Sequence, residues 1–250
     1  LNRRTVERDH RGLLDHLRAG MRVLDIGCGT GSITAGIARL AGAGGEVIGV
    51  DRDASLLDIG RREHAGLPGL RFEELDVLEL PYENHFDIAT AARLLQWIDD
   101  PLEVLRRMKT AAKPGGLVVV LDYNHSENTW EPEPPQSFRT FYRAFLDWRA
   151  ANQWSNRMAA ELPDLFRGAG IEVLRISNED EVAVRGEPHF ETAASLWAEV
   201  AESLGPAIVA AGFLSEKQRL DAAESYRAWI ADGLGRQSLC LRTVSGLVRG

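Results

Sequence analysis

Apolar runs alternate with amphipathic stretches through the first half of this chain. Short apolar runs predict five buried strands, at 21–26, 46–51, 70–75, 85–90 and 117–121. Between these runs apolar residues recur at helical spacing, as Ile33, Ile37 and Leu40 do. Strands that alternate with helices form a parallel sheet covered on both faces. We therefore predict an α/β fold with a doubly wound, mostly parallel sheet.

Outside this region the periodicity is mainly helical. Val6, Leu13, Leu14 and Leu17 share one stripe and predict a leading helix over 2–19. The later predicted elements are a helix, a sixth strand, two helices and a seventh strand, at 158–166, 171–176, 191–204, 215–230 and 238–248. Ser215 and Gln218 have the spacing of a capping box, which predicts the start of the last helix.

Aromatic residues gather in the second half of the chain. Five of the six tryptophans lie there, at positions 130, 148, 154, 197 and 229. One predicted helical face carries Phe138, Phe141, Tyr142, Phe145 and Trp148. Such a stripe is typical of a core, and the alternative interpretation is an apolar ligand pocket.

Composition and charge narrow the class of protein. With 250 residues, 44% of them hydrophobic and 26% charged, the chain has the composition of a soluble globular protein. It has no apolar run long enough for a membrane span and no signal-peptide pattern, so we expect a cytoplasmic protein without a membrane partner. The first residue is Leu1, not Met, which is compatible with the removal of a leader. Two cysteines form neither a disulfide framework nor a metal-binding spacing.

The net charge of −8 is concentrated in one segment. Residues 179–235 contain eleven acidic and four basic side chains. Nucleic-acid binders place lysine and arginine on one face, and this chain does the reverse over that segment. We therefore predict no nucleic-acid partner.

A glycine loop follows the first predicted strand. Asp25 ends the strand, and glycines at 27, 29 and 31 precede a helical pattern that starts at Ser32. Dinucleotide sites have the spacing G-x-G-x-x-G, which differs from this one. Asp25 would repel a pyrophosphate and attract an ammonium group. Asp51 ends the second strand 20 residues after Gly31, where an acid commonly binds ribose hydroxyls. A purely structural loop is the alternative.

Four motifs in order resemble those of the class I S-adenosylmethionine (SAM) dependent methyltransferases. They are the D-x-G-x-G-x-G loop, the acid at Asp51, the fourth-strand segment through Leu94-Leu95-Gln96-Trp97, and the turn Lys113-Pro114-Gly115-Gly116. The Leu-Gln-Trp segment looks like that of trans-aconitate methyltransferase and its small-molecule relatives. The resemblance covers about residues 23–121 and implies a seven-stranded Rossmann-like methyltransferase sheet, SAM as cofactor and a small-molecule acceptor.

The resemblance also assigns residues to the cofactor. Asp76 would bind the adenine amino group and Val77 its ring, while relatives usually have Asn where this chain has Ala92, so a backbone contact from Arg93 is expected instead. Arg3 and Arg4, on the leading helix, would reach the methionine carboxylate, and the favoured alternative is that both are ordinary solvent-exposed arginines. The full cofactor set is Asp25, Gly27, Cys28, Gly29, Gly31, Asp51, Arg52, Asp76, Val77, Arg93 and Trp97.

Methyl transfer needs positioning and, for a hydroxyl or ammonium acceptor, a base. His125, just past the fifth strand, is the first candidate for that base, and His189 is the second. Expected substrate contacts come from Tyr123, Trp130, Tyr142 and Trp148. No cluster of residues suggests a metal site.

We therefore predict a SAM-binding Rossmann-like core that the chain leaves twice to form a helical cap at the carboxyl edge of the sheet. The segments are 1–125 (core), 126–157 (first cap segment), 158–178 (core return), 179–235 (helical cap) and 236–250 (last core strand). The predicted activity is methyl transfer from SAM to O, N or C of a small molecule, by a monomer or homodimer. Two alternatives remain, a SAM-binding regulator or scaffold without catalysis and a nicotinamide-dependent oxidoreductase.

Overall fold

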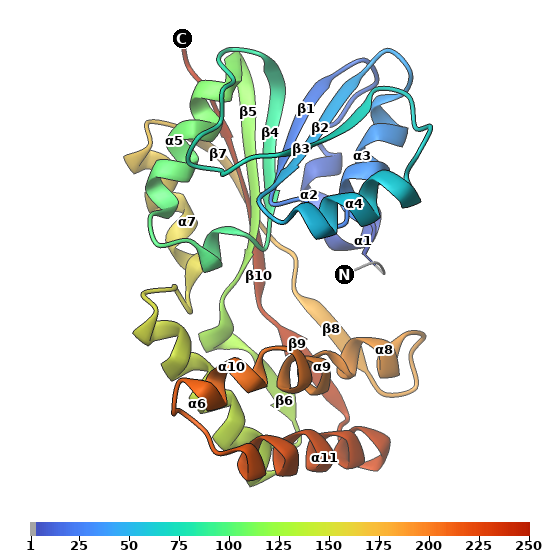
Figure 1. Cartoon of the computed structure of the whole chain (residues 1–250), viewed down its shortest axis with the longest axis vertical. Coiled ribbons are helices and arrows are strands. Elements are labelled where there is room, and N and C mark those ends of the chain that lie inside the picture. The colour runs from blue at the N-terminus through green and yellow to red at the C-terminus, as the bar shows by residue number, and fades with distance from the viewer. Residues whose placement is uncertain (1–3) are drawn as a thin grey trace. The chain divides into compact units, whose positions relative to one another are not determined.

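The computed structural model of this chain describes residues 4–250 and divides into two compact units (Figure 1). The first unit contains the residues up to Asp122, Met158–Glu179 and Arg242–Gly250. The second contains Tyr123–Arg157 and Asp180–Leu241. Each unit is described by itself below.

A seven-stranded sheet in the order β3-β2-β1-β4-β5-β10-β7 forms the centre of the first unit. Strands β1 to β5 pair in parallel, and β10 pairs antiparallel with β7. The strands are β1 (Arg22–Ile26), β2 (Glu46–Asp51), β3 (Leu70–Glu74), β4 (Phe86–Ala92), β5 (Ala112–Tyr123), β7 (Glu172–Asn178) and β10 (Leu241–Leu247). The predicted α/β fold with a mostly parallel, seven-stranded sheet is thereby confirmed.

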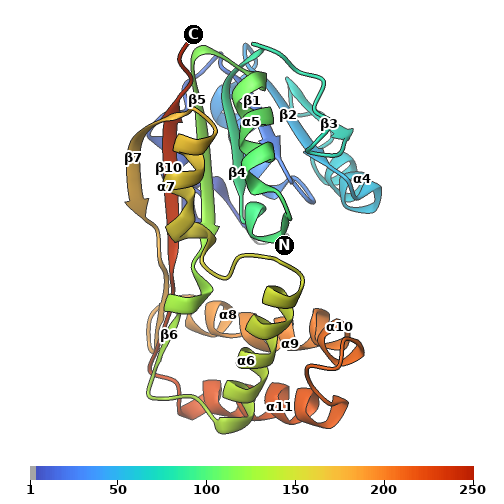
Figure 2. The same cartoon turned by 90° about the vertical axis from the view of Figure 1, so that its left-hand side faces the viewer.

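Both faces of the sheet are buried, because the inner strands are apolar on both sides. Leu24 and Ile26 of β1 pack into a cluster with α5 and α7, whereas Val23 packs into a cluster with the first three helices. Figures 1 and 2 show these two sets of helices on opposite faces. The helices of this unit are α1 (Val6–Asp9), α2 (Arg11–Leu14), α3 (Ser32–Ala41), α4 (Ala54–Glu63), the short η1 (Leu95–Trp97), α5 (Pro101–Ala111) and α7 (Met158–Gly168).

The second unit combines helices with a three-stranded antiparallel sheet in the order β6-β9-β8. Its core contains the aromatic face of α6, with Phe138, Phe141 and Phe145 all at most 2% exposed. Its elements are η2 (His125–Glu127), β6 (Thr129–Glu131), α6 (Gln136–Ala151), β8 (Glu181–Val184), α8 (Phe190–Ala194), α9 (Leu196–Ser203), α10 (Gly205–Ala210), α11 (Glu216–Asp232) and β9 (Arg236–Leu239).

Two of the elements predicted from the sequence are wrong in extent. The described part of the helix predicted over 2–19 is two four-residue helices, because His10 leaves the helical conformation and its ring enters the sheet region beside Thr90. The seventh strand predicted at 238–248 is two strands in different sheets. The strand is interrupted at Cys240, whose amide donates to Oδ1 of Asn128 at 2.8 Å.

The predicted segment boundaries change accordingly. The segment 236–250 is not purely core, because β9 belongs to the second unit. The segments 126–157 and 179–235 are not purely helical, since they contain β6 and β8. The capping box at Ser215 and Gln218 is confirmed at the start of α11.

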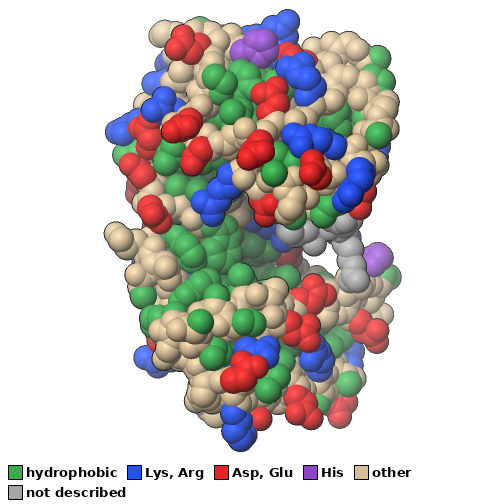
Figure 3. Space-filling view, in the orientation of Figure 1, with side chains coloured by type: hydrophobic (Ala, Val, Ile, Leu, Met, Phe, Trp, Pro, Cys, Tyr) green, Lys and Arg blue, Asp and Glu red, His purple; other side chains and the backbone are tan. Residues whose placement is uncertain are grey.

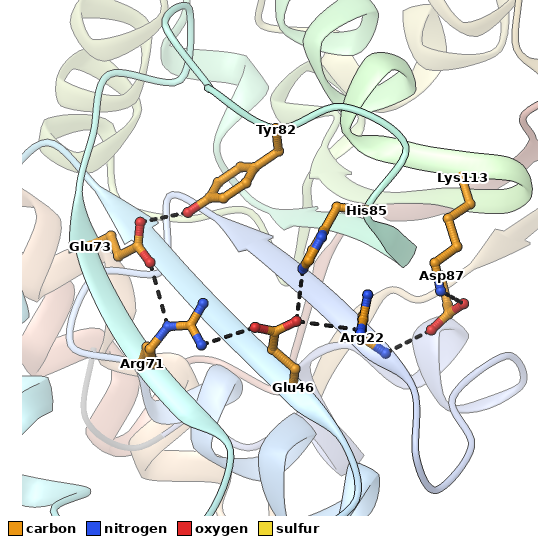
Figure 4. A network of polar contacts seen from close by, with 8 residues as sticks. All are labelled: Arg22, Glu46, Arg71, Glu73, Tyr82, His85, Asp87 and Lys113. Atoms are coloured by element: carbon orange, nitrogen blue, oxygen red, sulfur yellow. Dashed lines mark hydrogen bonds and ion pairs between the residues drawn. The ribbon is translucent and has the colours of Figure 1, made fainter.

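A network of charged side chains links the amino ends of the parallel strands (Figure 4). Glu46, at the start of β2, accepts hydrogen bonds from His85 at 2.8 Å and from Arg71 at 2.9 Å. Asp87 of β4 accepts one from the amide of Arg22 at 2.8 Å and pairs with Lys113 at 2.7 Å. This network lies at the amino ends of the strands, whereas the glycine loop follows the carboxyl end of β1.

Figure 3 shows basic and acidic side chains interspersed on the visible face of the first unit. Among residues 4–250, none of the helices is both long and apolar enough to cross a bilayer. No group of three or more potential metal-ligating side chains occurs among these described residues.

Candidate functional site

The glycine loop is fixed against the end of β2. The amides of Gly27 and Cys28 both donate to the carbonyl oxygen of Val50, at 2.8 and 3.0 Å. Gly29 has a φ of +56° and no atom within 4 Å of the place where a Cβ would stand. Its backbone conformation favours glycine, and the space above it is open to a ligand.

Asp51 is oriented by the same loop. One of its carboxylate oxygens accepts the amide of Gly29 at 2.8 Å, and the other accepts the amide of Asp53 at 3.0 Å. Each carboxylate oxygen can accept more than one hydrogen bond. The carboxylate therefore keeps acceptor capacity for a pair of hydroxyl groups while its direction is set by the backbone.

Asp25 is a buried acid beneath the loop, only 4% exposed. Thr34, on the first turn of α3, donates its hydroxyl to Oδ2 of Asp25 at 2.6 Å. Burial raises the pKa of Asp25 to about 7, with a further contribution from the nearby Asp51 and an opposing one from the Thr34 hydrogen bond. A cation beside such a buried carboxyl group favours its ionised form and lowers its pKa.

A hollow of about 430 Å³, open to solvent, lies at the carboxyl ends of β1 and β4. This is where open α/β sheets bind ligands. Its lining combines one acid, one guanidinium and the glycine loop, and consists of Arg4, Asp25, Gly27, Cys28, Gly29, Thr30, Ser32, Ile33 and Ala92. Arg4 was expected near a carboxylate of the cofactor, whereas Arg3 lies outside the described residues.

Of the remaining predicted cofactor residues only Cys28 lines the hollow, whereas Gly31, Asp51, Arg52, Asp76, Val77 and Trp97 are not among its lining residues. Gly31, with φ +74°, precedes α3, and the thiol of Cys28 has its pKa raised by burial. Arg52 and Asp76 are exposed, and Val77 is 8% exposed. Asp76 accepts the amide of Leu78 at 2.9 Å, as a turn aspartate does. Trp97 ends η1 and is partly buried.

The amide of Arg93 is bonded within the sheet, so the expected backbone contact to the cofactor stays a prediction for its carbonyl oxygen. That amide donates to the carbonyl oxygen of Leu121 at 2.7 Å. The Arg93 carbonyl accepts a hydrogen bond from Gln96 at 3.3 Å, and its guanidinium reaches Asp9. The residue of this segment that lines the hollow is Ala92.

His125 lies in the aromatic core of the second unit. Its ring stacks on Tyr123 at 5.1 Å and meets Phe145 edge-on at 5.4 Å. Burial, together with the charge of Arg149, lowers the pKa of His125 well below its usual value. The imidazole is therefore neutral throughout the physiological pH range. His189 precedes α8 and is exposed.

The predicted substrate aromatics lie in the same unit. The Tyr142 hydroxyl donates to the carbonyl oxygen of His125 at 2.6 Å. The Trp130 indole N–H is within 3.0 Å of Oε1 of Gln237, and its ring meets Tyr142 at 4.9 Å. Trp148, 8% exposed, packs edge-on against Trp154. These contacts support the core interpretation of the stripe, and a role in acceptor binding stays a prediction.

Several residues of the hollow were missed from the sequence. Thr30 lies within the glycine loop, and Ser32 and Ile33 begin α3 directly after it, so the signal for all three was their place in or next to the loop. Thr34 was missed because a threonine inside a helix looks like an ordinary helical residue until its partner Asp25 is located.

Comparisons with known proteins agree with this geometry. Residues 17–161 match the family model described as a methyltransferase domain. A demethylmenaquinone methyltransferase of Staphylococcus aureus (strain MRSA252) is 37% identical over 107 residues, which is 42% of this chain and 44% of that protein. The match thus spans less than half the length of this relative.

Solved structures share the fold over nearly the whole chain. The [4+2]-cyclase SpnF is 22% identical with a TM-score of 0.60, and covers 98% of this chain and 79% of its own. A phosphoethanolamine N-methyltransferase 2 of Haemonchus contortus, also 22% identical, has a TM-score of 0.57 and covers 96% of this chain and 52% of its own. These likenesses concern the fold. Together with the family match over more than half of its residues, they show that the chain belongs to the class I SAM-dependent methyltransferase domain family.

Proposed function

We propose that this protein transfers a methyl group from SAM to a small-molecule acceptor. The observation that carries the proposal is the hollow beside the glycine loop. The acidic Asp25 and the basic Arg4 both line it, so a ligand with an ammonium and a carboxylate group would find an oppositely charged partner for each. Asp25 suits the ammonium group of the methionine moiety, and Arg4 suits its carboxylate. Asp51, held by the loop amides, suits the two ribose hydroxyls.

The residues that line the hollow match the charges of the amino-acid end of the cofactor. The open space above Gly29 would admit a ligand against bare backbone. We propose that the full set predicted above, with Ala92 added as a wall residue, holds SAM. When bound, SAM supplies an electrophilic methyl group, and the protein's work is to orient the acceptor and exclude water.

We further propose that the acceptor is a small molecule recognised through the second unit, whose first segment directly follows β5. The demethylmenaquinone named for the Staphylococcus aureus relative is one acceptor to try. The likeness of the Leu-Gln-Trp segment to trans-aconitate methyltransferase makes a carboxylate-bearing acceptor another. The base role of His125, the acceptor contacts, a cytoplasmic location and a monomeric or homodimeric state stay predictions.

The test begins with cofactor binding. SAM and S-adenosylhomocysteine should raise the melting temperature and NAD and NADP should not, because a ligand at about a hundred times its Kd adds about 2.7 kcal/mol. Asp51→Ala should remove most of that shift. Asp53→Ala is the matched control, since Asp53 caps α4 in the same loop and should lower stability without changing the shift.

If the ligand shifts the melting temperature of Asp51→Ala as much as that of the wild type, the assignment of Asp51 to the ribose hydroxyls is wrong. Transfer of label from methyl-labelled SAM to a metabolite extract then separates an enzyme from a SAM-binding scaffold. Because one structural neighbour is described as a [4+2]-cyclase, the fold alone does not imply methyl transfer.

A further inference from the structure

The segment that contains Arg4 is fastened to the sheet by a buried ion pair. Nη1 of Arg93 donates to the carbonyl oxygen of Asp9 at 2.9 Å, and Nη2 lies 4.0 Å from Oδ1 of Asp9. The two side chains are only 4% and 8% exposed. Ion pairs buried to this degree are held by specific geometry, since water does not compensate for a displaced partner.

A second buried contact fixes the same turn. Nε2 of His10 lies 2.7 Å from the Thr90 hydroxyl, which itself donates to the carbonyl oxygen of Val119 at 2.8 Å. Because the Thr90 proton is used in that bond, His10 must donate from Nε2. His10 and Thr90 are both fully buried.

The backbone of Arg93 adopts a conformation that is uncommon for a residue other than glycine. Its φ is +60°, in the left-handed region that glycine adopts at lower cost. An arginine that occupies such a position must be compensated elsewhere. The compensation on this chain is the contact of its guanidinium with Asp9.

Asp9 also fixes the backbone next to Arg4. Oδ2 of Asp9 accepts the amide of Thr5 at 2.7 Å, so the carboxylate closes the turn immediately after Arg4. Arg4 then lines the hollow together with Asp25 and Ala92, the residue before Arg93. A continuous set of contacts therefore runs from the end of β4 to the only guanidinium among the described residues that line the hollow.

We propose that Arg93 is a positioning residue for the amino-acid end of the cofactor. Through Asp9 it holds the N-terminal segment so that Arg4 pairs with the carboxylate of the methionine or homocysteine moiety. The inference rests on the proposed function, because it takes the hollow as the SAM site.

The test compares two ligands that share adenosine and sulfur. S-adenosylhomocysteine has the amino-acid carboxylate, and 5′-methylthioadenosine lacks the whole amino-acid group. Calorimetry should show that Arg4→Gln and Arg93→Lys each raise the Kd for S-adenosylhomocysteine about tenfold and leave that for 5′-methylthioadenosine within about twofold. The double variant should be no weaker than Arg4→Gln alone, because both changes remove one interaction.

Arg93→Gly is the variant that separates positioning from folding. The relief of the left-handed backbone offsets part of the stability lost with the guanidinium contact. A melting scan first establishes that this variant is folded, and the folded variant should still lose S-adenosylhomocysteine affinity. Arg107→Lys, which changes an exposed arginine of α5, is the matched control and should alter neither Kd.

Three results would overturn the inference. They are an Arg93→Gly variant that binds both ligands as the wild type does, Arg93 variants that weaken both ligands equally, and additive losses in the double variant. If the wild type binds neither ligand, the proposed function itself fails. If it binds both and the variants have no effect, only the role of Arg93 fails.

Discussion

Asp25 combines burial with an unusual protonation equilibrium. Burial raises its pKa to about 7, so near neutral pH the free protein holds this group partly protonated. A cation beside the carboxylate favours its ionised form. Binding of a ligand with an ammonium group at this place is therefore coupled to the release of a proton.

This coupling predicts a pH-dependent affinity. Between pH 8 and pH 6 the Kd for S-adenosylhomocysteine should rise about tenfold, because below a pKa of about 7 each unit of pH costs up to tenfold. Asp25→Asn should bind weakly and show a flat profile, as calorimetry at three pH values would show. Asp58→Asn, a surface control on α4, should keep the wild-type slope.

The sign for stability follows from the same pKa. The raised pKa means that the folded chain keeps a proton that the unfolded chain loses, so this group favours folding at low pH. Its contribution falls as the pH rises from about 4 to about 7.

A Kd that does not change between pH 6 and pH 8 would contradict the assignment of the ammonium to Asp25.

Tyr142 tests the aromatic stripe at the same scale. Its hydroxyl donates to the carbonyl oxygen of His125 and accepts from Asn128 at 3.0 Å. Tyr142→Phe leaves both groups without this partner and should cost about 1–2 kcal/mol of unfolding free energy. Denaturant titration measures the loss, and under the core interpretation of the stripe the methyl-transfer rate per folded molecule stays unchanged. A rate loss with stability preserved would place the hydroxyl in the acceptor site instead.

Single residues were predictable where a local motif defines them. Asp25 and Asp51 follow from their spacing to the glycines, and the structure places Asp25 in the hollow and Asp51 against the loop. The role of the Arg93 side chain was not predictable, because its partner Asp9 lies 84 positions away. No local pattern records such a pair.

At the scale of elements, the amino ends of β1 to β5 are joined by the network around Glu46. Burial raises the pKa of Glu46, but the hydrogen bonds from His85 and Arg71 outweigh this effect and bring the pKa below its usual value. A lowered carboxyl pKa means stability that is present at neutral pH and is lost as the pH falls through the folded-state pKa.

Glu46→Gln should therefore destabilise the protein by about 1 kcal/mol at pH 7, because Glu46 is only 24% exposed and has several basic partners. The difference from the wild type should shrink as the pH falls through the folded-state pKa of Glu46, below which neither chain carries the charge. Urea unfolding over a series of pH values from 7 downward measures this change. A gap that persists at the lower pH would show that shape, not charge, is what Glu46 contributes.

Elements were predictable where sequence period and capping chemistry are local. The five parallel strands and the capping box of α11 are of this kind. The leading helix was wrong because His10 pairs with Thr90, 80 positions away, in preference to continuing the helix. Strands β6 and β8 were missed because they are three and four residues long, too short to show a period.

At the scale of the whole molecule, the chain leaves the first unit and returns to it. The departure after β5 and the return near 158 were predicted from the change to aromatic-rich helical patterns, and the unit boundary at Met158 agrees. The second return was placed too early, at 236 and not at Arg242. A run of strand-forming residues does not reveal which of two sheets each part joins, because both sheets accept the same residue types.

The position of β10 has a consequence for biosynthesis. This strand lies between β5 and β7, yet it is the last of the sheet to leave the ribosome. Until residues 241–247 emerge, β5 presents an open edge of backbone donors and acceptors to solvent or to other nascent chains. Vectorial synthesis therefore leaves the sheet incomplete until β10 is made, and β5 is open to mispairing up to that point.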